Sequence, residues 1–143
     1  MKTLKDLLKT DRIHYVNSGN PLLDVVKFMD QHNVGAVPIL NKEKKLIGIF
    51  SERDLLRRVV AKGLDLNSTI VDDVMTKEVI VIESHDTPEY CLQIMKQQNF
   101  RHIPVIEKKV LIGILSIKDL MLYDTQQKEE KIEQLHSYIQ FAG

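Results

Sequence analysis

The chain has 143 residues, with 20 basic and 20 acidic side chains and no net charge. This balance argues against binding of nucleic acid or an anionic membrane, because both select a basic excess. The only cysteine, Cys91, excludes an intrachain disulfide and suits a reducing compartment. No apolar run approaches the roughly 20 residues of a membrane-spanning helix, and the first residues lack a signal-peptide pattern. We therefore expect a cytoplasmic protein with one compact domain or two small halves.

The first half of the chain predicts one helix followed by a β-α-β-β-α unit. A short helix is expected at residues 2–9 and a strand at 13–16. Leu22, Val25, Val26 and Met29 recur at helical spacing and predict an amphipathic helix. The apolar runs AVPIL and KLIGIF, on either side of a polar NKEK turn, predict paired strands. A second helix is expected to start at Ser51.

Residues 63–73 are expected to link this unit to a second one, with Gly63 at the end of the preceding helix. The second unit predicts a strand at 79–82, then a helix that begins with the cap Thr87-Pro88. The runs HIPVI and VLIGIL predict two strands, and another helix is expected to start at Ser116. A final helix at residues 126–140 carries an apolar stripe that requires a partner: Ile132, Leu135 and Ile139.

The two halves are an internal repeat with a spacing of about 66 residues. The first set of identical positions is Met29, Gln31, Asn33 and Pro38, matched by Met95, Gln97, Asn99 and Pro104. After one deletion in the turn, the second set is Leu46, Ile47, Gly48, Ser51, Asp54 and Leu55, matched by Leu111, Ile112, Gly113, Ser116, Asp119 and Leu120. We therefore predict an α/β (α+β) fold of two β-α-β-β-α repeats, which pack sheet against sheet about a pseudo-two-fold axis. The predicted units are residues 1–66, 67–125 and 126–143.

Each repeat ends with the pattern G-h-h-S-x-x-D (h, hydrophobic) at the junction between a strand and a helix. Ser-x-x-Asp is close to a helix capping box, and an isolated example indicates capping alone. The same geometry also suits a nucleotide, because a helix N-terminus attracts phosphate and a carboxylate accepts hydrogen bonds from ribose hydroxyls. The serine hydroxyl would donate to phosphate, and Gly48 or Gly113 would allow a ligand close to the backbone.

Four features together resemble one known family. They are the repeat, the strand openings VGAVP (34–38) and FRHIP (100–104), the duplicated G-h-h-S-x-x-D, and DVMT (73–76) before the second copy. The chain is similar to tandem CBS (cystathionine-β-synthase-type) pairs, also called Bateman modules, over nearly its whole length. The N-terminal helix and the ending LHSYIQ (135–140) resemble one subgroup of these proteins. Its members are stand-alone CBS pairs of bacteria and plant organelles, without an attached enzyme or transporter domain.

This resemblance implies two ligand clefts between the modules. The first cleft would be lined by Ile49, Ser51, Arg53, Asp54, Thr76, Val81, Arg101 and His102. The second cleft would be lined by Tyr15, Gly35, Ala36, Val37, Ile114, Ser116, Lys118 and Asp119.

The resemblance also implies a role for these residues. Asp54 and Asp119 would hold ribose, adenine would lie among the apolar strand residues, and Ser51, Arg53, Arg101 and His102 would meet phosphate. The first cleft is ranked as the tighter phosphate site, because arginine binds phosphate in a bidentate manner. The expected ligand is an adenosine nucleotide: AMP or NAD first, with ATP or ADP as alternatives. No catalytic cofactor and no metal are expected.

Other residue patterns favour structural roles. The scattered histidines do not have metal-ligand spacing, Cys91 lies on an apolar helix face, and Asp72-Asp73 is read as the start of a short helix. The pair Arg57-Arg58 is read as surface charge, with contact to a phosphate as the alternative. Three functions stay open: a nucleotide-sensing regulatory module without catalysis, a structural dimer-forming protein with vestigial clefts, and, least favoured, an enzyme acting on the nucleotide. A homodimer is expected, and the regulated client protein cannot be named.

Overall fold

The computed structural model describes residues 2–8 and 13–129 of the chain. The first module contains β1 (Val16–Asn17), α2 (Leu22–His32), β2 (Ala36–Leu40), β3 (Leu46–Ser51), α3 (Glu52–Asp54) and the π-helical turn η1 (Leu55–Val60). A short 3-10 helix, η2 (Val71–Asp73), follows in the linker. The second module contains β4 (Ile82–Glu83), α4 (Pro88–Gln98), β5 (His102–Glu107), β6 (Val110–Ser116) and α5 (Ile117–Glu129). A short helix, α1 (Leu4–Leu7), precedes both modules.

Both modules have the same sheet. In the first, β1 lies parallel to β2, and β2 lies antiparallel to β3. In the second, β4 lies parallel to β5, and β5 lies antiparallel to β6. Even the irregularity in register recurs, between Ile39 and Leu40 in one sheet and between Val105 and Ile106 in the other. The predicted fold class, two β-α-β-β-α repeats, is confirmed.

The long helix of each module ends in the same way. Asn33 (φ 54°) and Asn99 (φ 58°) both adopt the left-handed conformation that asparagine tolerates well. At the start of α4, the Thr87 hydroxyl accepts a hydrogen bond from the Tyr90 amide, and Pro88 occupies the first helical turn, as predicted. The repeat therefore extends from the strands to the helix termini.

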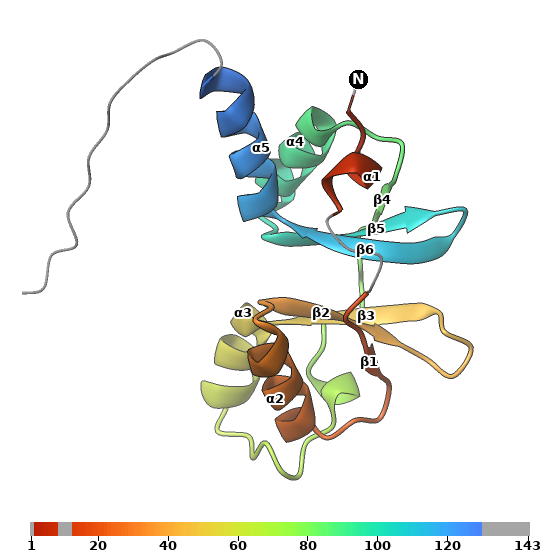
Figure 1. Cartoon of the computed structure of the whole chain (residues 1–143). Coiled ribbons are helices and arrows are strands. Elements are labelled where there is room, and N and C mark those ends of the chain that lie inside the picture. Colours follow the sequence, from red (N-terminus) through yellow and green to blue (C-terminus); the bar gives the residue numbers. More distant parts are fainter. Residues whose placement is uncertain (1, 9–12, 130–143) are drawn as a thin grey trace, which may run out of the picture.

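The modules stack with their sheets facing each other and their helices outside (Figure 1). Each module keeps a separate apolar core between its sheet and its helices. The first core includes Phe50, Ile39 and Leu22, and the second includes Ile103, Leu115 and Met95. The sheet of a single module would expose its second face to water, and the stacking covers that face.

Helix α1 packs on the second module, although it precedes the first in sequence (Figure 1). Leu4 is fully buried in the second core, where Leu7 and Leu8 pack beside it. The Lys5 ammonium lies 3.1 Å from the Glu107 carboxylate on β5. This ion pair is exposed and contributes little, so burial of the leucines is the main attachment.

Several predicted boundaries were wrong. The first strand of each module lies later than expected, at Val16–Asn17 and Ile82–Glu83, because only these residues pair with the central strand. Residues 126–129 continue α5 instead of starting a separate helix, and the stripe of Ile132, Leu135 and Ile139 lies outside the described residues. Gly63 was predicted to be the C-cap of the helix before it, but η1 is capped by Ala61, and Gly63 lies two residues further on with φ at 71°. Within the described residues, no helix is long and apolar enough to cross a membrane.

Candidate functional site

Both Ser-x-x-Asp motifs form helix caps. The Ser51 hydroxyl accepts a hydrogen bond from the Asp54 amide at 3.3 Å, and the Asp54 carboxylate accepts one from the Ser51 amide at 3.0 Å. The same reciprocal pair joins Ser116 and Asp119, at 3.1 and 3.0 Å. The capping interpretation of the motif is therefore correct in both repeats. It leaves a nucleotide role open, because a cap keeps the carboxylate at the helix N-terminus.

The Asp54 carboxylate lies in a network that reaches the linker. The Thr76 hydroxyl donates to it at 3.2 Å, and the Arg58 Nε lies 3.4 Å from Oδ1. Thr76 also exchanges two backbone hydrogen bonds with Ile49, at 3.0 and 2.9 Å. Four residues named for the first cleft, Ile49, Ser51, Asp54 and Thr76, are therefore in direct contact.

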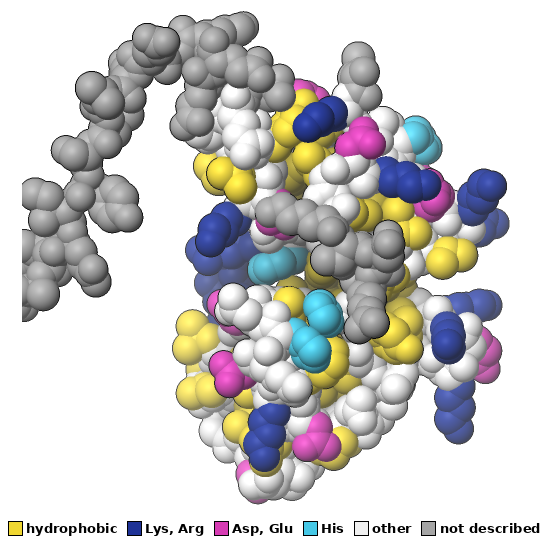
Figure 2. Space-filling model, in the orientation of Figure 1, with side chains coloured by type: hydrophobic (Ala, Val, Ile, Leu, Met, Phe, Trp, Pro, Cys, Tyr) yellow, Lys and Arg dark blue, Asp and Glu magenta, His cyan; other side chains and the backbone are white. Residues whose placement is uncertain are grey.

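The two modules meet beside the predicted clefts, where the segment before β2 faces the segment that opens β5. A Cβ atom added to Gly35 would lie 3.1 Å from the Glu52 carboxylate and 3.3 Å from His102 Nε2. Arg53 reaches across from α3 and donates to the Asn99 carbonyl at 3.4 Å. In Figure 2, Lys and Arg side chains gather beside a histidine at the left edge, between the modules.

The pKa of the His102 side chain is shifted at this junction. Burial lowers the pKa of its imidazole below the usual 6.5, and Arg101 lowers it further, while the carboxylates of Glu52 and Asp119 oppose the shift. Near neutral pH the ring is therefore neutral. A bound phosphate would add negative charge here and favour the imidazolium form.

The other predicted residues lie at the edges of this junction or beneath it. Arg101, Lys118, Tyr15 and Val81 are exposed. Ile114 is half-buried, and Ala36 is buried. Val37 is fully buried in the first core, so only its backbone can face a cleft. The predicted second-cleft residues are thus brought together less directly than those of the first.

The two motif glycines have a different role from the predicted one. A Cβ atom on Gly48 would lie 2.9 Å from Cγ of Met75, and one on Gly113 would lie 2.7 Å from Cδ2 of Leu8. Met75 lies in the segment that leaves the first module beside β3, and Leu8 ends α1 on the second module, beside β6. Each glycine therefore leaves room for a side chain of the protein itself. The prediction that it lets a ligand approach the backbone was wrong for the side on which a Cβ atom would lie.

Two residues of the site were missed or misread. Glu52 was treated as a variable position of the motif, and its only sequence signal is its place in the first turn of α3. Arg58 was read as surface charge, but it contacts Asp54 from one turn further along. The i, i+4 spacing of an acid and a base on one helix was the available signal.

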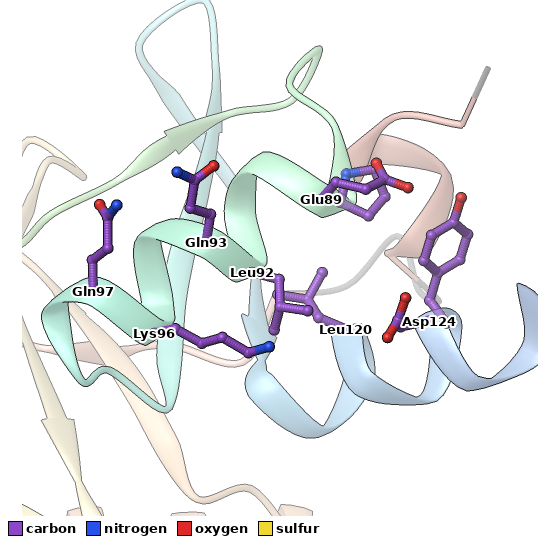
Figure 3. Close-up of a pocket in the computed structure, with 9 residues that line it drawn as sticks. Glu89, Leu92, Gln93, Lys96, Gln97, Leu120 and Asp124 are labelled. Atoms are coloured by element: carbon purple, nitrogen blue, oxygen red, sulfur yellow. The ribbon is translucent and has the colours of Figure 1, made fainter. Parts of the chain in front are cut away.

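The surface has two further grooves, one beside the Asp54 network and one on the outer helices of the second module. One, of about 390 Å³, is lined by Arg58, Asp73, Met75, Thr76, Lys77 and Glu78, and it borders the Asp54 network. The other, of about 430 Å³, lies between α4 and α5, where Leu92 and Leu120 form its floor and Glu89, Lys96 and Asp124 its rim (Figure 3). This second groove is outside both predicted clefts.

Cysteine and metal chemistry receive no support in the part of the chain that the structure describes. Cys91 is fully buried in the second core, and burial raises the pKa of its thiol to about 11, with Asp86 adding to the shift. A protonated thiol of this kind is a poor nucleophile. Within residues 2–8 and 13–129, no three or more His, Cys, Asp or Glu side chains lie close enough together to hold a metal ion.

Comparison with known proteins settles the family. The model of the CBS domain matches residues 4–61 and 71–125, one match for each module. The chain belongs to the CBS domain family. It is a tandem CBS pair, and each matched range holds one Ser-x-x-Asp cap.

Relatives share the pair over different parts of their length. CBS domain-containing protein CBSX3, mitochondrial, of Arabidopsis thaliana is 35% identical over 88% of this chain and 63% of its own length. YhcV of Bacillus subtilis is 31% identical over 84% of both chains. The crystal structure of ATU1752 from Agrobacterium tumefaciens is 31% identical, with a TM-score of 0.80 over 86% of this chain and 99% of that one. The chain thus spans less than two thirds of CBSX3.

Proposed function

We propose that this CBS pair is a regulatory module that binds an adenosine nucleotide (AMP, ADP, ATP or NAD) in the clefts between its modules and performs no catalysis. The observation that carries the proposal is the duplicated cap. Each module holds a carboxylate at a helix N-terminus, and both helices start on the side of their module that faces the other module (Figure 1). The CBS pair of MJ0100, with the same fold at a TM-score of 0.79 and 23% identity, was crystallised with 5′-methylthioadenosine and S-adenosyl-L-methionine.

The chemistry of the proposed clefts follows from the groups present. Carboxylate oxygens of Asp54 and Asp119 would accept hydrogen bonds from the 2′- and 3′-hydroxyls of ribose. Arg53, Arg101 and His102 would bind the 5′ phosphate of a nucleotide in the first cleft, and Lys118 one in the second. A ligand in contact with both modules changes their relative position only through a difference in affinity between two arrangements.

Isothermal titration calorimetry with AMP, ADP, ATP, NAD and S-adenosylmethionine tests the proposal. At least one of them is expected to bind with a dissociation constant below about 1 mM, which corresponds to roughly 4 kcal/mol. Weaker binding by all five would contradict a sensor function. Recovery of unchanged nucleotide after prolonged incubation is the expected result for a module without catalysis.

We also propose that the protein forms a homodimer through the outer helices. Leu56 on η1 and Met121 on α5 are 61% and 51% exposed at corresponding positions of the repeat. Hydrophobic side chains are exposed on both modules along the left side of Figure 2, over this region. Such aligned apolar surface typically marks a protein contact.

Light scattering is expected to give about twice the chain mass of 16.5 kDa. The double variant Leu56→Glu/Met121→Glu is expected to be monomeric, since it would bury two charges in each half of the interface. Val110→Glu is the control, because Val110 is 62% exposed in the β5–β6 hairpin, away from these helices. A monomeric wild-type protein would contradict the dimer.

A structural, dimer-forming role is the second candidate. The reciprocal Ser–Asp hydrogen bonds favour it, since they satisfy both caps without a ligand. The calorimetric test separates the two candidates. The sequence-based expectation of a cytoplasmic protein is retained as a proposal, and a regulated client protein is implied by the sensor function alone.

A further inference from the structure

The carboxylate of Asp54 already has its hydrogen-bonding positions filled. A carboxylate offers about four acceptor positions. Oδ2 accepts from the amide and the hydroxyl of Ser51, at 3.0 and 3.1 Å. Oδ1 accepts from the Thr76 hydroxyl at 3.2 Å and faces Arg58 Nε at 3.4 Å. Two ribose hydroxyls that donate to this carboxylate would therefore have to displace partners that are already bound.

The four partners of the Asp54 carboxylate differ in how easily a ligand can displace them. Both Ser51 groups belong to the cap, and losing them would open the first turn of α3. The Thr76 hydroxyl is fixed to the site because its backbone is bonded to Ile49 on both sides. The Arg58 side chain is 49% exposed and ends in a guanidinium that water solvates well. Arg58 is therefore the partner that a ligand displaces at the lowest cost.

Arg58 also contacts the linker between the modules. Its Nη1 donates to the Met75 carbonyl at 3.0 Å, next to Thr76. One side chain thus joins the helix that carries Asp54 to the segment that leads into the second module. A ligand that displaces Arg58 from Asp54 would weaken this connection as well.

The second module lacks this arrangement. At the repeat spacing that aligns Asp54 with Asp119, Tyr123 takes the place of Arg58. A phenol ring cannot form the ion pair that a guanidinium forms with a carboxylate. Among the described residues, Asp119 forms no ion pair. Competition by a cation on the same helix is thus specific to the first cleft.

We propose that Arg58 competes with the ribose diol for Asp54 and thereby lowers the affinity of the first cleft for adenosyl ligands. This inference rests on the proposed function. It names Arg58 as a specificity-determining residue that the ligand must displace. The first cleft was ranked as the tighter phosphate site, and for ligands without phosphate Arg58 would weaken that cleft.

The test measures binding of neutral adenosyl ligands to the full chain, in an Asp119→Asn background that weakens the second cleft. Arg58→Gln is expected to bind adenosine and 5′-methylthioadenosine about three- to fivefold more tightly than the background protein, the gain that corresponds to one exposed ion pair. Neutral probes remove the attraction between Arg58 and a phosphate. Binding of 2′,3′-dideoxyadenosine, which lacks the diol, is expected to be the same in both proteins.

Arg57→Gln is the matched control, because it removes the same charge from the neighbouring residue and is expected to leave binding unchanged. Arg58→Tyr, which copies the second module, repeats the test if the glutamine variant is unstable. Equal or weaker binding of adenosine by both Arg58 variants would overturn the inference and leave the proposed function intact. No adenosine binding by any of these proteins, or by the wild type, would also overturn the inference, and the proposed function would fall with it only if AMP, ADP, ATP, NAD and S-adenosylmethionine fail to bind as well.

Discussion

Asp54→Ala and Asp119→Ala are each expected to weaken adenosyl-ligand binding in one cleft by about a hundredfold or more. Each change removes the charged acceptor of two ribose hydrogen bonds, and hydrogen bonds to charged groups contribute about 1.5–3 kcal/mol each. Calorimetry with AMP measures the effect. If the wild type binds two molecules per chain, each variant is expected to retain one site of unchanged affinity.

Controls separate this effect from loss of folding, since both aspartates also cap helices. Asp54→Asn and Asp119→Asn keep an oxygen acceptor for the cap and remove the charge, so they are expected to weaken AMP binding with a smaller loss of stability. Asp30→Ala, on the exposed side of α2, is expected to change neither binding nor stability. Unchanged AMP affinity in both alanine variants would show that the ligand site lies elsewhere.

Gly48→Ala is expected to lower the free energy of unfolding by about 1–3 kcal/mol, the usual cost of overpacking a core. The new methyl group would meet the Met75 side chain, which is buried in the first core and would have to shift. Urea denaturation followed by circular dichroism measures the loss. The midpoint is expected to fall, with no change in the slope.

The second module provides the comparison for this effect. Gly113→Ala is expected to cost less, because the atom it meets is the end of the Leu8 side chain, and Leu8 is only partly buried. In a double-mutant cycle, Met75→Ala is expected to remove most of the penalty of Gly48→Ala. Equal losses for the two glycine variants would contradict the packing seen at Gly48.

The repeat made much of the fold predictable. An identity at a fixed spacing carries the same local structure, so Asn33 and Asn99 end equivalent helices, and Thr87 caps α4 as its sequence indicates. The position of α1 could not be predicted in this way. The apolar residues Leu4, Leu7 and Leu8 show that the helix has a buried face, but periodicity does not say which module buries it.

The contacts of the candidate site were also predictable only where they are local in sequence. The Ser51–Asp54 and Ser116–Asp119 contacts are local, because a capping box spans three residues, and the sequence predicts them. Contacts across the junction depend on how two modules dock. The approach of His102 to Glu52 and Gly35, and that of Arg53 to Asn99, are of this second kind. A local motif could not indicate them.

The position of α1 on the second module has a mechanical consequence. The chain starts on the second module at Leu4, enters the first at Val16, and returns to the second at Ile82. The modules are therefore joined by two covalent connections. Two bodies joined at one point can swivel in any direction, whereas two bodies joined at two points turn mainly about the line through both. The path of the polypeptide thus leaves the two modules fewer relative movements than a single linker would allow.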